Sequence, residues 1–79
     1  MKLRFVVVAQ NNADVLARVV MLFHRSAVQI ESLHMPTRGR RSEVKITIRV
    51  SGKHTNASRM VAILEKAVDV RSVEMISSE

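Results

Sequence analysis

The sequence predicts an α+β domain with the element order βαββαβ, in which two strand–helix–strand halves share one sheet. Residues 43–51 alternate between apolar and polar side chains, as a half-buried strand does. Residues 15–23 and 57–68 instead repeat apolar side chains near the helical period. Right-handed crossovers place both helices over the same face of one antiparallel sheet. We therefore expect a ferredoxin-like sandwich, with a four-stranded antiparallel sheet, two helices on one face, and the first and third strands in the middle.

Length and composition indicate one small domain that needs a partner. The 79 residues are 47% hydrophobic, so we expect a single folded domain over residues 1–79. A chain of this size buries only about 60% of its unfolded surface, and it has no cysteine for a disulfide. Association is the remaining stabiliser, so we expect at least a homodimer. No segment has the length of a membrane span or a full signal-peptide core, which predicts a cytoplasmic location.

The first strand is expected over residues 2–9 and has apolar side chains on both faces. Leu3, Phe5 and Val7 share one face, while Val6 and Val8 lie on the other. This pattern is typical of a central strand that helices cover on one side and a partner covers on the other.

The first helix is expected over residues 14–25. Asn12 or Asp14 can cap its start, because either short side chain accepts a hydrogen bond from an unpaired backbone amide. Arg25 suits the negative end of the helix dipole. The apolar positions of the helix are Val15, Leu16, Val19, Val20, Leu22 and Phe23.

The second strand is expected over residues 28–36, and its alternation changes parity. Val28 and Ile30 agree with each other. Leu33 and Met35 take the other parity, which predicts a β-bulge near Ser32.

Pro36 and the residues after it indicate a sheet edge followed by a turn. Proline at the end of a strand fits an edge position, where the missing N–H donor costs little. Residues 37–43 are expected to form the turn, with Gly39 supplying backbone freedom. The simplest interpretation of Arg38, Arg40 and Arg41 is a solvated hairpin tip.

The second half of the chain repeats the strand–helix–strand pattern. The third strand is expected over residues 43–51, with Val44, Ile46, Ile48 and Val50 facing inward. A loop follows, with Thr55 or Asn56 as helix caps, and the second helix runs to about residue 67. Its apolar stripe comprises Ala57, Met60, Val61, Leu64, Ala67 and Val68. The last strand is expected over residues 71–76, with Val73 and Met75 on one face.

The sequence offers little catalytic chemistry. His24, His34 and His54 have no metal-ligand spacing. The carboxylates are scattered, and two glycines are too few for a phosphate-cradling loop. No serine lies in a strained strand-to-helix turn. We therefore expect a non-catalytic protein with no metal or cofactor of its own.

RNA binding is the main alternative from another functional class. The net charge is +6, and Lys45, Arg49 and the arginine-rich turn are able to contact phosphates. A sheet of this topology binds bases by stacking them on aromatic side chains of its central strands. The chain has only two aromatic residues, Phe5 and Phe23, and the third strand has none. Nucleic acid is therefore not the expected partner.

The segment NNADVLARVVMLFHRSAVQIESLHMPT, residues 11–37, resembles an ACT domain, and more narrowly the small regulatory subunit of acetohydroxyacid synthase (acetolactate synthase). Residues 64–76, LEKAVDVRSVEMI, resemble that family's second helix and last strand. The similarity covers nearly the whole chain, and IESL after LARVVMLFHR is its most specific part. The matching positions are Asn11, Leu16, Arg18, Val19, Leu22, Phe23, Ile30, Glu31, Ser32, Leu33, Pro36 and Thr37.

The resemblance implies a feedback-regulation module in branched-chain amino-acid biosynthesis. In that family an amino acid binds between paired ACT domains, and backbone amides at the start of the first helix hold its carboxylate. The implied effector-binding residues are Asn11, Asn12, Ala13, Asp14, Val15 and Leu16, facing Val28, Gln29 and Ile30 across a homodimer interface made by the second strand and the first helix. The partner implied is the catalytic large subunit, which, unlike this chain, binds thiamine diphosphate and magnesium.

The chain departs from the family pattern near the implied site. Asp14 and Ala27 stand where the family has glycine, and Gln29 stands where it has asparagine. An aspartate brings a negative charge and can itself satisfy the helix-start amides. We therefore predict that Asp14 closes the site and that amino-acid feedback is weak or lost. A stand-alone ACT sensor for another small molecule is the alternative within the same class.

Overall fold

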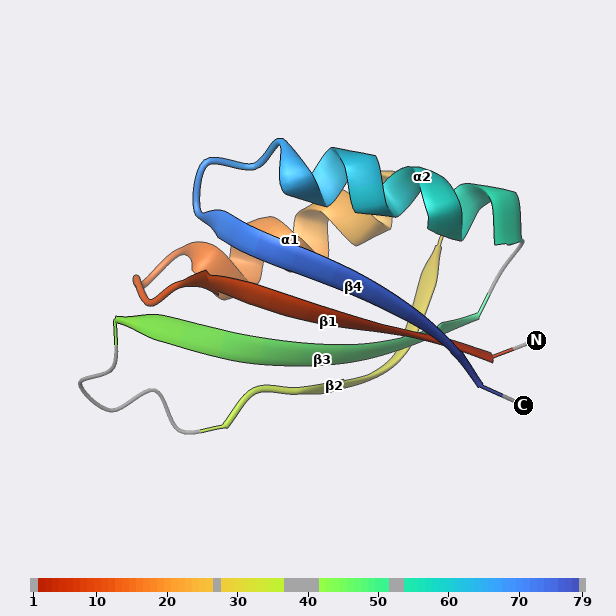
Figure 1. The fold of residues 1–79 in the computed structure, drawn as a ribbon, viewed down its shortest axis with the longest axis horizontal. Coiled ribbons are helices and arrows are strands. Elements are labelled where there is room, and N and C mark those ends of the chain that lie inside the picture. Colours follow the sequence, from red (N-terminus) through yellow and green to blue (C-terminus); the bar gives the residue numbers. More distant parts are fainter. Residues whose placement is uncertain (1, 27, 37–41, 52–53, 79) are drawn as a thin grey trace.

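The computed structural model describes residues 2–26, 28–36, 42–51 and 54–78, and Figure 1 shows their arrangement. The elements are β1 (Lys2–Gln10), α1 (Val15–Arg25), β2 (Gln29–His34), β3 (Glu43–Ser51), α2 (His54–Glu65) and β4 (Val70–Ser78). This is the predicted βαββαβ order. The arginine-rich turn at residues 37–41 lies outside the described residues.

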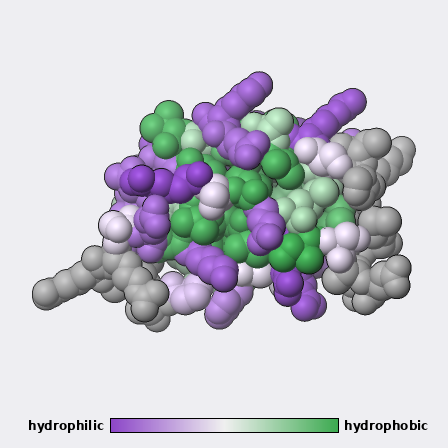
Figure 2. Space-filling model, in the orientation of Figure 1, coloured by the Kyte–Doolittle hydropathy of each residue, from purple (hydrophilic) through white to green (hydrophobic). Residues whose placement is uncertain are grey.

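The four strands form one antiparallel sheet in the order β2-β3-β1-β4, so β1 and β3 are the central strands, as predicted. The register places Phe5 opposite Ile48 and Val7 opposite Ile46, which brings the inward side chains of both strands to one face. In the view of Figure 1 the strands lie in front of α1, and α2 lies above them. Hydrophobic residues occupy the middle of this visible side, and hydrophilic residues surround them (Figure 2).

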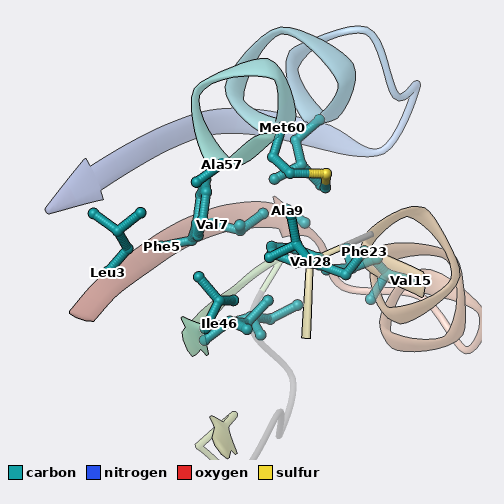
Figure 3. Close-up of a cluster of buried hydrophobic side chains, with 14 of the residues drawn as sticks. Leu3, Phe5, Val7, Ala9, Val15, Phe23, Val28, Ile46, Ala57 and Met60 are labelled. Atoms are coloured by element: carbon teal, nitrogen blue, oxygen red, sulfur yellow. The ribbon is translucent and has the colours of Figure 1, made fainter. Parts of the chain in front are cut away.

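A single hydrophobic core fills the space between the sheet and the helices (Figure 3). Phe5 from β1 and Phe23 from α1 are both fully buried and meet edge to face, with ring centroids 5.2 Å apart. Such pairs add to the free energy of area burial. The buried apolar side chains are Leu3, Phe5, Val7, Ala9, Val15, Val19, Phe23, Val28, Val44, Ile46, Ile48, Val50, Ala57, Met60 and Leu64. The inward faces predicted for β1 and β3 are therefore confirmed.

The irregularity predicted in β2 is confirmed. The register between β2 and β3 shifts between Ile30 and Ser32, because an extra residue on β2 breaks the strict pairing. Val28 before the shift is buried, and Leu33 after it packs against the core. The bulge therefore turns apolar side chains of both parities toward the same side.

The second helix differs from the prediction at both ends. It begins at His54, so Thr55 and Asn56 lie in its first turn and not at its cap. Packing of Ala57, Met60 and Leu64 in the core outweighs the preference of Thr and Asn for a cap position. The helix ends at Glu65, and Val68 then lies in the turn with 93% of its surface exposed, so its predicted place on the buried stripe was wrong.

Candidate effector site

The segment between β1 and α1 is held in place by hydrogen bonds to two other parts of the chain. The amide of Gln10 donates to the carbonyl of Asp69 at an N···O distance of 2.7 Å. The amide of Asn11 donates to the carbonyl of Ser42, at 2.9 Å, beside the start of β3. The start of α1 is thus positioned by the α2–β4 turn on one side and by β3 on the other.

Asn12, and not Asp14, supplies the side-chain hydrogen bond at the start of α1. Its Oδ1 accepts from the amide of Asp14 at 3.0 Å, which forms an Asx turn. Asp14 occupies the N-cap position, but its φ of −99° and ψ of −7° are already helical, and its side chain makes no capping hydrogen bond. A capping side chain needs an extended backbone to reach the amides of the first turn. The expectation that Asp14 satisfies these amides itself was therefore wrong.

Two backbone amides at the start of α1 consequently lack an acceptor among the described residues. The amide of Val15 donates to the carbonyl of Asn12 at 3.4 Å, and the first helical bond runs from Arg18 to Asp14 at 3.1 Å. Within the described residues, the amides of Leu16 and Ala17 have no protein acceptor. These are the orphan donors that a helix start offers to a carboxylate.

A salt bridge joins α1 to the α2–β4 turn. The guanidinium of Arg18 donates to the carboxylate of Asp69, whose side chain is only 11% exposed. A carboxylate with so little contact with water requires a charged partner. The pair therefore fastens α1 to the far half of the chain, immediately beside the candidate site.

We expect Arg18→Ala to lower the free energy of unfolding by about 1–3 kcal/mol, because it leaves the Asp69 carboxylate without its charged donor. The lower half of that range is favoured since Arg18 is 59% exposed, which lets water replace part of the interaction. The matched control is Arg71→Ala, which breaks the exposed 3.4 Å pair with Glu43 and should cost less than about 1 kcal/mol. Urea denaturation measures both, and equal losses would contradict this role for Arg18.

The outer side of α1 carries an uncovered apolar surface that continues onto the start of β2. A shallow depression of about 630 Å³ lies along the helix. A second, of about 320 Å³, lies between the helix and β2. Val20 and His24 line both, so the two depressions adjoin each other at these residues. The first is lined by Ala13, Leu16, Ala17, Val20, Met21 and His24, and the second by Val20, His24, Val28, Gln29 and Ile30.

The structure brings together five of the nine residues implied as effector-binding: Ala13, Leu16, Val28, Gln29 and Ile30. Asn11, Asn12 and Asp14 lie at the start of the helix but do not line either depression. Val15 is 1% exposed and belongs to the core, so only its backbone is near the site.

Sequence reasoning missed Val20 and His24 as members of this surface. Val20 was assigned to the apolar stripe of the helix, yet it is 37% exposed. A second stripe beside the buried one, made by residues 13, 16, 17, 20, 21 and 24 at helical spacing, was the available signal. The apolar face of this helix is wider than the part that the core covers. Apolar surface therefore remains for contact with another molecule.

Neither a cluster of metal ligands nor a membrane-spanning helix is present in the described part of the chain. No group of three or more potential metal ligands occurs there. None of the helices described is long and apolar enough to cross a membrane. The base-stacking mode of RNA binding also has no support, because Phe5 and Phe23 are the only aromatic residues and both are fully buried.

Comparison with known proteins assigns the family. The ACT domain family profile matches residues 11–73, more than half of the chain. The chain belongs to the ACT domain family. ACT domains are regulatory, so the resemblance inferred from the sequence is confirmed at this level. No curated protein sequence matches this ACT domain.

Solved structures similar to this ACT domain come from several kinds of protein. The acetolactate synthase small subunit from Thermotoga maritima is 21% identical, with a TM-score of 0.84 over 98% of this chain and 48% of that one. The ACT domain of GTP pyrophosphokinase from Chlorobium tepidum is 12% identical, with a TM-score of 0.82 over 96% and 97%. A homoserine dehydrogenase from Thiobacillus denitrificans is 16% identical, with a TM-score of 0.76 over 96% and 17%. At these identities the likeness shows the fold alone.

This ACT domain therefore spans about half the length of the Thermotoga maritima subunit. The same fold forms a small part of the homoserine dehydrogenase and almost the whole of the Chlorobium tepidum domain. The choice among these contexts depends on the residues of the site and not on the fold.

Proposed function

We propose that this ACT domain is a non-catalytic regulatory subunit of acetolactate synthase in branched-chain amino-acid biosynthesis, and that it acts as a homodimer with weakened amino-acid feedback. The observation that carries the proposal is the apolar surface of two adjoining depressions, which lie along α1 and at the start of β2. It has the two halves that the resemblance requires, a helix start with open amides and an edge strand.

The proposed homodimer joins the α1 outer face and the β2 edge of one copy to those of a second copy. β2 is an edge strand, so one side of it has unpaired backbone groups that a second β2 is able to pair. Met21 and Val20, 52% and 37% exposed, lie on the α1 outer face. An isologous two-fold contact of this kind extends the sheet across both copies and at the same time covers the apolar face of each α1 helix.

The effector crevice in this dimer lies between the start of α1 in one copy and the start of β2 in the other. The open amides of Leu16 and Ala17 suit the carboxylate of an amino acid. Val28 and Ile30 supply apolar surface for an aliphatic side chain, and Gln29 supplies a polar group. The arrangement therefore fits a small aliphatic amino acid.

The side chain of Asp14 does not occupy the helix-start amides. Asp14 therefore weakens this site by its negative charge and not by blocking the amides. Two negative charges about 4 Å apart repel by roughly 1 kcal/mol in water, which corresponds to about a fivefold weaker binding constant. We therefore expect feedback that is reduced and not abolished, with the donor amides still free to bind.

We expect Asp14→Asn to tighten valine binding about fivefold, because it removes the charge and keeps the size of the side chain. Asp14→Gly tests whether bulk contributes as well, and a larger gain than that of the Asn variant would show that it does. Glu65→Gln, which removes a negative charge at the end of α2, is the control and should change nothing. Isothermal titration with valine, leucine and isoleucine measures all three. A micromolar dissociation constant for the unchanged chain would refute weakened feedback.

The experiment that tests the proposed function adds this chain to the purified catalytic subunit and measures acetolactate formation with and without valine. We expect the chain to raise the rate and valine to lower it only slightly. A rate that does not respond to the chain would remove the acetolactate synthase assignment, whereas the family assignment would stand.

A further inference from the structure

On the face of the sheet opposite the helices, the side chains that the structure describes include the cations Arg4, Lys45 and Arg49, which we name the open-face patch. Arg4 on β1 stands directly opposite Arg49 on β3 in the register. Lys45 is on the same face of β3, four residues from Arg49, and it stands opposite Val8. Like charges directly opposite each other destabilise an antiparallel pair. The chain thus keeps a locally unfavourable arrangement on this face.

The cations of the open-face patch have no acidic partner within the described residues. The two salt bridges found there are Arg18 with Asp69 and Arg71 with Glu43, and neither includes a member of the patch. Glu74 on β4 stands opposite Val6, diagonal to Arg4, and makes no ion pair with it. The Nε of Arg4 is buried and also lacks a hydrogen-bond partner among the described residues. The charge of the patch is therefore not neutralised by the residues that the structure describes.

Aliphatic side chains lie between and beside these cations. Val6 and Val8 of β1 and Ile76 of β4 are on the same face, and all three are half-buried. The space-filling view shows hydrophobic residues in the middle of the side where the strands are in front, with hydrophilic residues around them (Figure 2). An apolar centre inside a polar rim is the anatomy of a protein–protein interface.

RNA is the less suitable occupant of this face. Single-stranded nucleic acid is held by stacking its bases on aromatic side chains, and both aromatic residues of the chain are buried in the core. Valine and isoleucine provide no such platform. The cations would contact phosphates, but the aliphatic centre would remain without a suitable partner group.

We infer that the open face docks onto an acidic surface of a partner protein, with Val6, Val8 and Ile76 in apolar contact and the open-face patch matched to carboxylates. The inference rests on the proposed function for the identity of that partner, the catalytic subunit. The α1 outer face and the β2 edge are used by the proposed homodimer, whereas this face stays open in it. Two copies joined edge to edge would present two such patches on one extended sheet.

Charge reversal tests the inference. The variant Lys45→Glu/Arg49→Glu should weaken binding to the catalytic subunit at least about tenfold, because it sets like charges against each other. Both side chains are exposed, so the fold should survive, and circular dichroism checks this. Lys45→Gln/Arg49→Gln should give an intermediate loss. The control, Arg59→Glu/Lys66→Glu, makes the same change of charge at exposed positions on or just after α2 and should stay within about twofold.

The outcomes separate this inference from the proposed function. If the unchanged chain and all variants bind the catalytic subunit equally, the proposed function stands and the docking surface is wrong. If the control loses as much affinity as the open-face variant, the effect is one of net charge and the docking surface is again wrong. Binding that weakens with rising salt in the unchanged chain, and less steeply in the open-face variant, supports the inference.

A second measurement applies if the unchanged chain does not bind the catalytic subunit, in which case the proposed function fails. Poly-L-glutamate is then titrated into the isotope-labelled chain and followed by NMR. Shifts confined to Lys45, Arg49 and the methyl groups of Val6 and Val8 would support an acid-binding open face. Shifts centred on Arg59 would overturn it, as would tighter binding of a polyuridine oligonucleotide than of poly-L-glutamate to the same face.

Discussion

Phe23→Ala should lower the free energy of unfolding of this domain by about 3–5 kcal/mol at 25 °C. Phe23 is fully buried on α1, and its ring meets that of Phe5 edge to face across the core. Truncating a buried phenylalanine to alanine costs about 3–5 kcal/mol, from lost burial and the cavity that remains. A chain of this length has a total stability of roughly 4–12 kcal/mol. The substitution therefore removes a large share of the free energy that holds α1 on the sheet.

Urea denaturation followed by circular dichroism measures the effect of Phe23→Ala. Val68→Ala is the matched control, because Val68 is also apolar but is 93% exposed in the α2–β4 turn. The Val68→Ala substitution should change the free energy of unfolding by less than about 0.5 kcal/mol. A Phe23 variant with a denaturation midpoint close to that of the unchanged chain would mean that the edge-to-face pair is not central to the core.

Val20→Asp should convert the proposed homodimer into monomers. Val20 lies on the α1 outer face, where it lines both depressions and is 37% exposed in the single chain. An aspartate buried there without a partner should cost at least about 3 kcal/mol, which raises the dimer dissociation constant more than about a hundredfold. Any valine response of the acetolactate synthase activity should disappear too, since the crevice needs both copies.

Sedimentation equilibrium over a range of concentrations checks the Val20 prediction. Ile63→Asp is a close control, because Ile63 is an exposed aliphatic residue on the other helix, 36% exposed, and lies outside the proposed contact. It should leave the association state unchanged. A monomeric unchanged chain, or a Val20 variant that still dimerises at the same concentration, would refute an interface on this face.

Much of the fold could be predicted from local patterns. The strand over residues 43–51 was predicted with the bounds that the structure shows, because its alternation is strict and inward side chains differ sharply from outward ones. The bulge in β2 was evident from the change of parity around Ser32. The prediction failed at the start of α2, where Thr55 and Asn56 lie inside the helix although both residue types are favoured at a cap.

The candidate site could be predicted only in part. The residues at the start of α1 and of β2 followed from the family resemblance, and the structure brings part of that set onto one surface. The behaviour of Asp14 did not follow, since capping depends on the backbone angles of a single residue, and these are helical here. The Asx turn made by Asn12 therefore leaves two helix amides open.

The order of the elements, the central place of β1 and the inward faces of β1 and β3 are properties of the sequence itself. Each depends on a periodicity that extends over a few neighbouring residues. Which apolar residues stay uncovered was decided only by the tertiary structure. Val19 and Val20 are adjacent on one helix, yet one is 1% exposed and the other 37% exposed. The difference arises because coverage depends on strands that are distant in the chain, and no local pattern records where those strands will lie.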